Sequence, residues 1–170
     1  MPPDFTSALG RLLADGGLRA RFRLDPAGTA ADLGVEALAS LDPEGLERQA
    51  ETLLAKRLHE VSKLMPASFA ALGPGAAPLF RAHAAAGWPV GHRRHLADAV
   101  AFGRYLMGEG VGGVCRSEFN RLRFALEGGR WALRLVPDAL AGGRRRAAVQ
   151  VLWRGRGGDV RSAAVWFGFA

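Results

Sequence analysis

The sequence predicts an α+β fold, with an all-helical N-terminal body followed by a C-terminal antiparallel sheet of about four strands. Three observations predict it. Apolar residues recur every three or four positions up to about residue 107, glycines gather at 108–113, and apolar and polar residues then alternate. We therefore divide the chain into a helical domain over 1–110 and a basic β-sheet subdomain over 111–170.

Net charge is distributed unevenly between these two parts. Residues 1–110 contain twelve Lys and Arg against twelve Asp and Glu, whereas residues 111–170 contain eleven Arg, no Lys and four acids. The formal net charge of +7 therefore belongs to the C-terminal part. Such a tail suits an acidic partner, either a peptide or a nucleic acid.

Cysteine usage and hydropathy indicate the compartment. The single Cys115 cannot form an internal disulfide, and no run approaches the roughly 18 apolar residues that a membrane span needs. The first residues also lack the basic and apolar regions of a signal peptide. We therefore expect a cytoplasmic protein with no membrane association.

The helical body is expected to begin with short helices over 5–14, 18–24 and 27–33. The longest helix is expected to start after Asp42, which suits the N-cap, with Pro43 at the first helical position and Pro66 just past the end. Lys63 is expected to pair with Glu60 on its exposed face. Further helices are expected at about 68–72, 76–86 and 96–107.

The tail is expected to start with a hairpin over 121–136 that turns at Gly128-Gly129. This register places Arg123 opposite Arg134 on one face and Trp131 on the opposite, apolar face. Strands over about 146–154 and 160–169 complete the sheet. The aromatic residues of the tail are expected to lie in the core: Trp131, Trp153, Trp166 and Phe167.

Three arginines of this predicted sheet, Arg121, Arg123 and Arg134, are our candidate peptide-binding residues. Like charges that face each other across a sheet destabilise it unless an acid neutralises them. Planar guanidinium groups also bind carboxylates and phosphates through paired hydrogen bonds. The alternation also puts Trp131 on the other face of the sheet from Arg134. A surface that stacks nucleic-acid bases needs exposed aromatic residues beside arginines, so this placement argues against one.

The segment Gly91-His92-Arg93-Arg94-His95 has the composition of a metal site, with His83 upstream and Cys115 downstream. Two imidazoles three positions apart can share a metal on a helix. Because two arginines would repel a cation, we instead favour partner docking through His92, Arg93, Arg94 and His95, with no metal and no cofactor.

Catalysis on Cys115 is the remaining chemical alternative. An enzyme of this kind needs a general base beside the thiol, and the sequence identifies none. We therefore expect a protein that is not an enzyme. Turnover that disappears with Cys115→Ala would establish the alternative.

Residues 46–107 carry a further pattern of helix ends and turns. It consists of Leu64-Met65-Pro66, Leu72-Gly73, Leu79-Phe80, Trp88-Pro89 and a closing helix with Asp98, Phe102 and Tyr105-Leu106. This pattern resembles the helical partner proteins of the multinuclear non-heme iron-dependent oxidative enzymes. Some members of that family carry a label as DNA-binding domains. The long N-terminal extension of short helices and Met65 before Pro66 depart from the commonest family pattern.

The resemblance implies a non-catalytic accessory subunit in the biosynthesis of ribosomally made, post-translationally modified peptides. Such a protein docks on a barrel-fold iron enzyme and recruits the acidic leader of a precursor peptide, whose cysteine the enzyme then modifies. The iron and its ligands would belong to the enzyme. The alternative from another class is a small basic DNA- or RNA-binding protein, because phosphate neutralisation requires only arginines.

Overall fold

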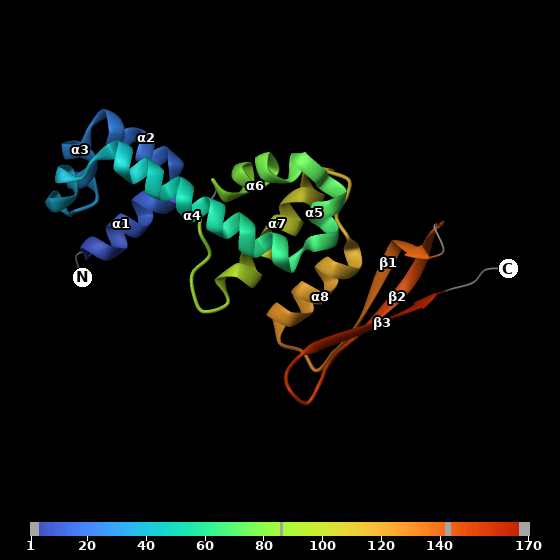
Figure 1. Ribbon diagram of the computed structural model, residues 1–170. Helices are drawn as coiled ribbons and strands as arrows, with labels where there is room; N and C mark the ends of the chain where they lie inside the picture. Colours follow the sequence, from blue (N-terminus) through green and yellow to red (C-terminus); the bar gives the residue numbers. More distant parts are fainter. Residues whose placement is uncertain (1–3, 86, 142–143, 167–170) are drawn as a thin grey trace. The chain divides into compact units, whose positions relative to one another are not determined.

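The computed structural model describes residues 4–85, 87–141 and 144–166, with the backbone alone at 138–141 and 144–146 (Figure 1). The N-terminal elements are α1 (Phe5–Ala14), α2 (Gly16–Leu24), α3 (Pro26–Asp32) and the 3-10 helix η1 (Glu36–Ser40). The middle elements are α4 (Pro43–Leu64), α5 (Pro66–Leu72), the 3-10 helix η2 (Gly73–Gly75), α6 (Ala76–Ala84) and α7 (Arg94–Gly108). Helix α8 (Arg116–Glu127) then leads into β1 (Trp131–Ala141), β2 (Arg144–Arg154) and β3 (Val160–Trp166). The predicted α+β class is confirmed.

The chain divides into two compact units. The first unit contains residues 1–59 and 77–88, and the second contains residues 60–76 and 89–170. The predicted boundary at residue 110 lies inside the second unit, between α7 and α8. The division into 1–110 and 111–170 therefore stays a prediction.

Aspartates begin the first three helices. The side chains of Asp4, Asp15 and Asp25 each accept a hydrogen bond from the backbone N–H three residues later, at 2.6, 3.0 and 2.9 Å. Each carboxylate satisfies an N–H that the helix itself leaves unpaired. The helices enclose a small core of buried side chains: Ala8, Leu12, Phe22, Ala30, Leu33, Leu38 and Leu46.

Helix α4 starts and ends as the sequence predicts. The Asp42 carboxylate accepts hydrogen bonds from the N–H groups of Glu44 and Gly45, at 3.0 and 2.8 Å. The predicted ion pair between Lys63 and Glu60 is present at 3.0 Å. Its apolar stripe buries Leu46, Ala50 and Val61.

Close packing of α7 on α8 organises the core of the second unit. A Cβ placed on Gly103 of α7 would lie 2.6 Å from the ring of Phe119 of α8. The absence of a side chain at Gly103 therefore lets the two helices approach each other. The buried apolar residues around them are Val61, Met65, Ala99, Val100, Phe102, Leu106, Phe119, Leu122 and Phe124.

The predicted hairpin at Gly128-Gly129 is wrong, because residues 116–127 form helix α8. Gly128 adopts the left-handed conformation at the helix end, with φ of 83°, and its N–H donates to the carbonyl of Phe124. A Gly-Gly pair ends a helix as readily as it turns a hairpin. Phe119 and Leu122 are buried three positions apart, which is helical spacing. The apolar residues at 122, 124 and 126 also alternate as in a strand, and the prediction followed that shorter pattern. The sheet therefore has three strands instead of four.

These strands form one antiparallel sheet in the order β1-β2-β3. The face toward α8 buries Val136, Ala148, Gln150 and Leu152, whereas the other face exposes Trp131, Leu133 and Leu135. The prediction that Trp131 and Arg134 lie on opposite faces is confirmed. The predicted strand over 160–169 ends at Trp166 among the described residues.

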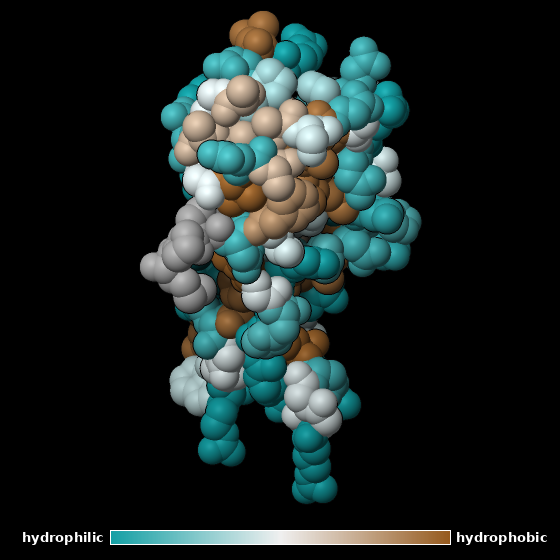
Figure 2. Space-filling view, turned by 90° about the vertical axis from the view of Figure 1, so that its left-hand side faces the viewer, coloured by the Kyte–Doolittle hydropathy of each residue, from teal (hydrophilic) through white to brown (hydrophobic). Residues whose placement is uncertain are grey.

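The expectation of buried tail aromatics is wrong. Trp131, Trp153 and Trp166 are 69%, 37% and 41% exposed, and Phe167 lies outside the described residues. Side chains along a strand point alternately to the two faces of the sheet, and α8 covers the face opposite to that of Trp131 and Trp153. These two tryptophans therefore stay exposed. The space-filling view from another side shows apolar patches between hydrophilic areas (Figure 2), which is ordinary for a protein surface.

Candidate functional site

The three candidate peptide-binding arginines come from two elements of the second unit. Arg121 and Arg123 lie on α8, so their predicted position on a strand is wrong, whereas Arg134 lies on β1 as expected. Arg121 is exposed, and the side chains of Arg123 and Arg134 are 42% and 32% exposed. All three guanidinium groups are therefore accessible to solvent at least in part.

Glu127 links two of these arginines. Its carboxylate accepts a hydrogen bond from Nε of Arg123 at 2.5 Å and another from Nη2 of Arg134 at 3.0 Å. The hydrogen bond from Arg123, with the positive charges of both arginines, lowers the pKa of Glu127 below its ordinary value. From the sequence we expect an acid beside Arg123 and Arg134, and Glu127 of the same chain is that acid. Arg123 and Glu127 are four positions apart, so a prediction of helix for this segment would also have predicted their ion pair.

Positive charge nevertheless exceeds negative charge in this cluster. One carboxylate, Glu127, accompanies the two guanidinium groups of Arg123 and Arg134. Arg121 lies two positions before Arg123 on α8, so its side chain leaves the helix on another side and lies outside this cluster. Nε of Arg134 is buried and has no hydrogen-bond partner within the described part of the chain. Because Arg123 and Arg134 together exceed Glu127 by one charge and are partly exposed, they can bind a further anionic group, such as a carboxylate or a phosphate.

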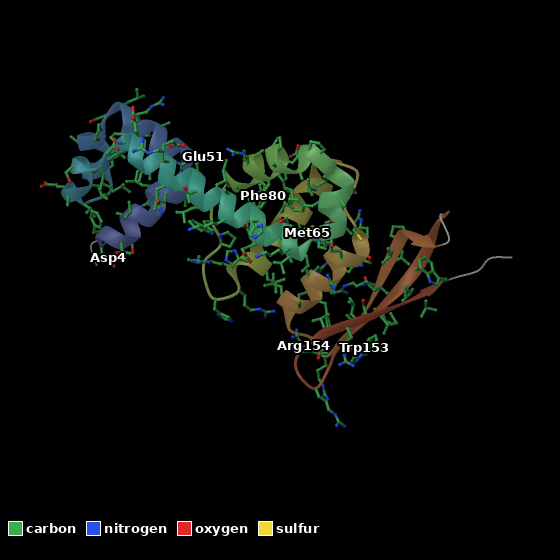
Figure 3. The ribbon with its side chains drawn as sticks, in the orientation of Figure 1. Asp4, Glu51, Met65, Phe80, Trp153 and Arg154 are labelled. Carbon is green, nitrogen blue, oxygen red and sulfur yellow. The ribbon has the colours of Figure 1, made fainter. Side chains whose placement is uncertain are left out.

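Arg93 and Arg154 bind the C-terminal carbonyl groups of α8. Arg93 donates to the carbonyls of Leu126, at 3.2 Å, and Ala125. Arg154, at the end of β2 (Figure 3), donates to the same Ala125 carbonyl at 3.2 Å and to Gly129 at 3.1 Å. Positive groups at this end complement the helix dipole. Arg93, a predicted docking residue, therefore has a structural role inside the second unit.

The other three predicted docking residues surround the start of α7. His92 is exposed in the preceding turn, Arg94 is the exposed first residue of α7, and His95 is half-buried. Nδ1 of His95 is buried and has no hydrogen-bond partner among the described residues. Nothing in the geometry tests docking through this turn, which stays a prediction.

Cys115 belongs to a hydrogen-bonded cluster around the buried carboxylate of Glu118. Glu118 accepts hydrogen bonds from the N–H groups of Ala67 and Ser68, both at 3.0 Å, and from Oγ of Ser68 at 2.7 Å. The N–H of Cys115 donates to Oγ of Ser68 at 3.0 Å, and its Sγ lies 3.3 Å from Oγ of Ser117. This cluster joins the start of α5 to the start of α8, and no pattern in the sequence indicates it.

A cavity of about 600 Å³ lies between this cluster and the sheet. Nε2 of Gln150 donates to the carbonyl of Ser117 at 3.0 Å, whereas its buried Oε1 has no partner among the described residues. The wall is built mainly from small side chains and one tryptophan: Ala67, Ala71, Gly112, Gly113, Val114, Cys115, Arg116, Ser117, Val136, Ala148, Gln150, Ser162, Ala163, Ala164 and Trp166. Four of these residues, Ser162, Ala163, Ala164 and Trp166, belong to β3, so the cavity borders this strand.

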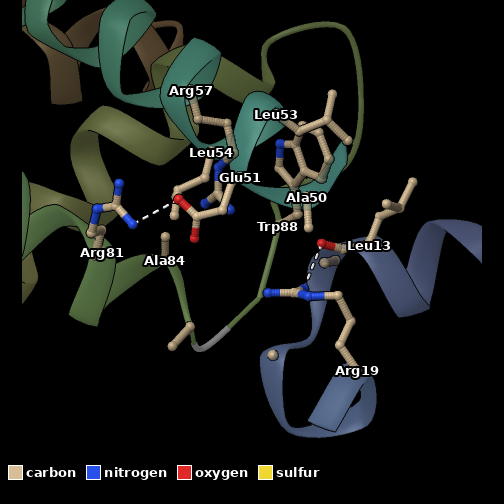
Figure 4. A pocket seen from close by; sticks show the side chains of 13 residues that line it. Leu13, Arg19, Ala50, Glu51, Leu53, Leu54, Arg57, Arg81, Ala84 and Trp88 are labelled. Atoms are coloured by element: carbon tan, nitrogen blue, oxygen red, sulfur yellow. Dashed lines mark hydrogen bonds and ion pairs between the residues drawn. The ribbon is translucent and has the colours of Figure 1, made fainter. Parts of the chain in front are cut away.

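The first unit contains a smaller cavity of about 200 Å³ (Figure 4). The buried guanidinium of Arg57 lies 5.3 Å from the ring centroid of Trp88 and donates to the carbonyl of Gly87 at 3.1 Å. Arg81 donates to Glu51 at 2.7 Å. These contacts connect α6 and the segment after it to α4, so the arginines stabilise the unit.

Within residues 4–85, 87–141 and 144–166, no three His, Cys, Asp or Glu side chains lie close enough together to hold a metal ion. No helix in the same residues combines the length and hydropathy of a membrane span.

Residues 34–108 match a family model described as "SCO6045-like, C-terminal domain". The match spans η1 to α7 and includes residues 46–107, where the sequence resembles the iron-enzyme partner proteins. The description names no activity, substrate or partner. Comparisons with curated proteins and with solved structures find no significant match.

Proposed function

We propose that this protein is a non-catalytic accessory protein that binds an extended, acidic peptide. The observation that carries the proposal is the open edge of β3, a seven-residue strand with six exposed residues. An exposed strand edge presents unpaired N–H and C=O groups that an extended peptide can bind through main-chain hydrogen bonds.

The two edges of the sheet differ in a way that favours β3. On β1, Pro137 lacks an N–H donor, and the register with β2 shifts between Val136 and Ala139. Proline and irregular register are devices that protect an edge from further pairing. Strand β3 has no proline and pairs with β2 in continuous register. A peptide strand therefore adds more readily to β3.

The arginine cluster supplies the preference for an acidic peptide. Arg123 and Arg134 outnumber the single carboxylate of Glu127, exposed Arg121 adds positive charge on another side of α8, and the C-terminal part of the chain carries the whole formal charge of +7. Charge complementarity of this kind raises association rates and selects partners. We assign acidic-residue binding to these three arginines.

The enzyme and pathway in this proposal come from the sequence resemblance. We propose a cytoplasmic protein that docks on a barrel-fold multinuclear iron oxidative enzyme and recruits the leader of a ribosomally made precursor peptide. The enzyme would hold the iron and modify a cysteine of the peptide. The turn at 92–95 would face this enzyme through His92, Arg94 and His95.

The test uses a fluorescein-labelled synthetic acidic peptide, whose sequence is taken from the leader of any Cys-containing precursor that the gene neighbourhood encodes. We expect the Arg121→Glu variant and the Arg123→Glu/Arg134→Glu variant to weaken its binding at least about tenfold at low salt. Arg104→Glu, with the same charge change at an exposed position of α7, serves as the control. Unchanged affinity in both variants would refute the arginine assignment.

Two further measurements test the edge and the enzyme. A leader peptide with alternate N-methylated amides should lose affinity, because methylation removes main-chain donors and blocks strand pairing. Co-purification with any iron enzyme that the gene neighbourhood encodes, with and without the peptide, tests docking. Equal binding of methylated and unmethylated peptide would rule out strand addition.

A second candidate function is binding of single-stranded DNA or RNA. The observation that favours it is the exposure of Trp131 and Trp153, which lie in register with Arg161 across the three strands. Exposed aromatic side chains beside arginines can stack bases and neutralise phosphates. Binding of a labelled oligonucleotide at physiological salt, lost in Trp131→Ala, would support this function.

A further inference from the structure

The outer face of the sheet, which points away from α8, is an ordered apolar surface. The strand register aligns its side chains in three rows across β1, β2 and β3. The rows are Trp131, Trp153 and Arg161, then Leu133, Val151 and Ala163, then Leu135, Val149 and Val165. Eight of these nine residues are apolar. We call these nine residues the outer face.

Solvent reaches this surface along its whole length. Trp131, Leu133 and Leu135 on β1 are 69%, 54% and 67% exposed, and Val165 on β3 is 51% exposed. A contiguous group of large exposed apolar side chains marks an interaction site in soluble proteins. A single exposed leucine requires no such explanation, but an aligned set across three strands does.

One end of the outer face is cationic. Arg130, Trp131, Arg154, Gly155 and Arg156 surround a hollow of about 590 Å³ beside the row that contains Arg161. Arg154 is committed to the carbonyls of α8, and Arg161 pairs with Asp159 at 2.7 Å. Arg130 and Arg156 are exposed and add positive charge there. The opposite row, Leu135, Val149 and Val165, is wholly apolar, and β2 begins beyond it with Arg144, Arg145 and Arg146.

We propose that the outer face binds one amphipathic helix of a partner protein. The apolar stripe of the helix lies on the rows, and its acidic residues lie over the cationic end. Three strands at a spacing of about 4.8 Å span roughly 10 Å, which matches the diameter of one helix. A helix C-terminus carries partial negative charge, so this end of the partner helix lies next to Arg130 and Arg156.

Charge and composition disfavour the other occupants. Two copies of this chain would bring together two C-terminal parts that each carry a net charge of +7 and therefore repel each other. A nucleic acid requires aromatic side chains along its path, and two of the three rows contain none. Helix binding on the outer face does not depend on peptide binding at the β3 edge.

The test uses two helix-forming peptides of about 18 residues with the same leucine stripe. One peptide carries three Glu residues in its last turn, and the other carries three Lys residues there. We expect the acidic peptide to bind at least about tenfold more tightly by fluorescence anisotropy, and the preference to fall with salt. Leu135→Glu should abolish binding, whereas Val90→Glu, at a residue that is 96% exposed and outside the sheet, should not.

Several results would overturn the proposal. They are equal affinity of the two peptides, absence of binding, equal loss in Val90→Glu, and a dimer that Leu135→Glu dissociates. Tight oligonucleotide binding that Leu135→Glu abolishes would assign the face to nucleic acid instead. Trp131→Gln, also at a highly exposed position, replaces Leu135→Glu if circular dichroism shows that the latter is unfolded.

The same variants separate helix binding from the proposed function. Leu135→Glu should leave binding of the extended leader peptide unchanged, because Leu135 lies on the opposite face of β1 from Arg134. Arg123→Glu/Arg134→Glu should leave binding of the helical peptide unchanged. If only one of the two peptides binds, one proposal fails and the other stands.

Discussion

Glu127 of α8 accepts a hydrogen bond from Arg134 of β1, with 3.0 Å between Oε2 and Nη2. The same carboxylate pairs with Arg123 on its own helix. A single acid thus joins the last turn of α8 to the first strand and partly neutralises the cluster that we assign to an acidic partner.

Replacing Glu127 with Gln should have opposite effects on stability and binding. The loss of two partly exposed ion pairs should lower the free energy of unfolding by about 0.5 kcal/mol. Affinity for an acidic peptide should rise, because a competing carboxylate has gone. Urea unfolding and anisotropy measure the two effects. Glu109→Gln removes an exposed acid elsewhere in the second unit and should alter stability less. Weaker peptide binding in Glu127→Gln would contradict the assignment of this cluster.

The contribution of Glu127 to stability should depend on pH. Its pKa is lowered from 4.5 in the folded state, mainly by the hydrogen bond from Arg123. Stabilisation is therefore complete above the unfolded pKa and is lost as pH falls through the lowered folded value. The difference in unfolding free energy between wild type and Glu127→Gln should vanish in acid. A difference that grows on acidification would show the opposite shift.

Gly103→Ala should destabilise the second unit. The added Cβ would lie 2.6 Å from the ring of Phe119, which packs in the core and cannot move without opening a gap. We expect a loss of about 1–3 kcal/mol in thermal or urea unfolding. Gly10→Ala is the matched control, because Gly10 lies inside α1 and a Cβ placed there would have nothing within 4 Å. That variant should be neutral or more stable, since alanine favours helices.

Glu118→Gln should lower stability more than an exposed substitution of the same kind. The buried carboxylate accepts three hydrogen bonds, and the amide group of Gln would place N–H against at least one of these donors. The expected loss is about 2 kcal/mol. Glu44→Gln, whose native side chain is 85% exposed, provides the comparison. Equal effects of the two substitutions would show that the cluster around Ser68 contributes little.

Features set by neighbouring residues could be predicted from the sequence, and those set by distant contacts could not. Asp42, Pro43 and the Lys63–Glu60 pair follow local rules of helix capping and spacing, and the structure confirms them. Residues 121–127 satisfy both a helical and an alternating pattern, so tertiary packing of Phe119 and Leu122 decided between them.

The candidate site shows the same limit. Sequence reasoning selected Arg123 and Arg134 and required an acid beside them, but the wrong element assignment hid Glu127. It also assigned Arg93 to a partner, because nothing near residue 93 in the sequence indicates that its guanidinium reaches the carbonyls of residues 125 and 126. The exposed outer face could not be foreseen because α8 covers the opposite side of the sheet.

The Glu118 cluster determines where this protein can be divided. A fragment that ends at residue 110 would contain α5 but lack the carboxylate that binds the N–H groups of Ala67 and Ser68. It would also leave Arg93 without the carbonyls of α8. We therefore expect the helical segment from 60 to 110 to be less stable without residues 115–127. A fragment prepared for study should continue at least through the sheet.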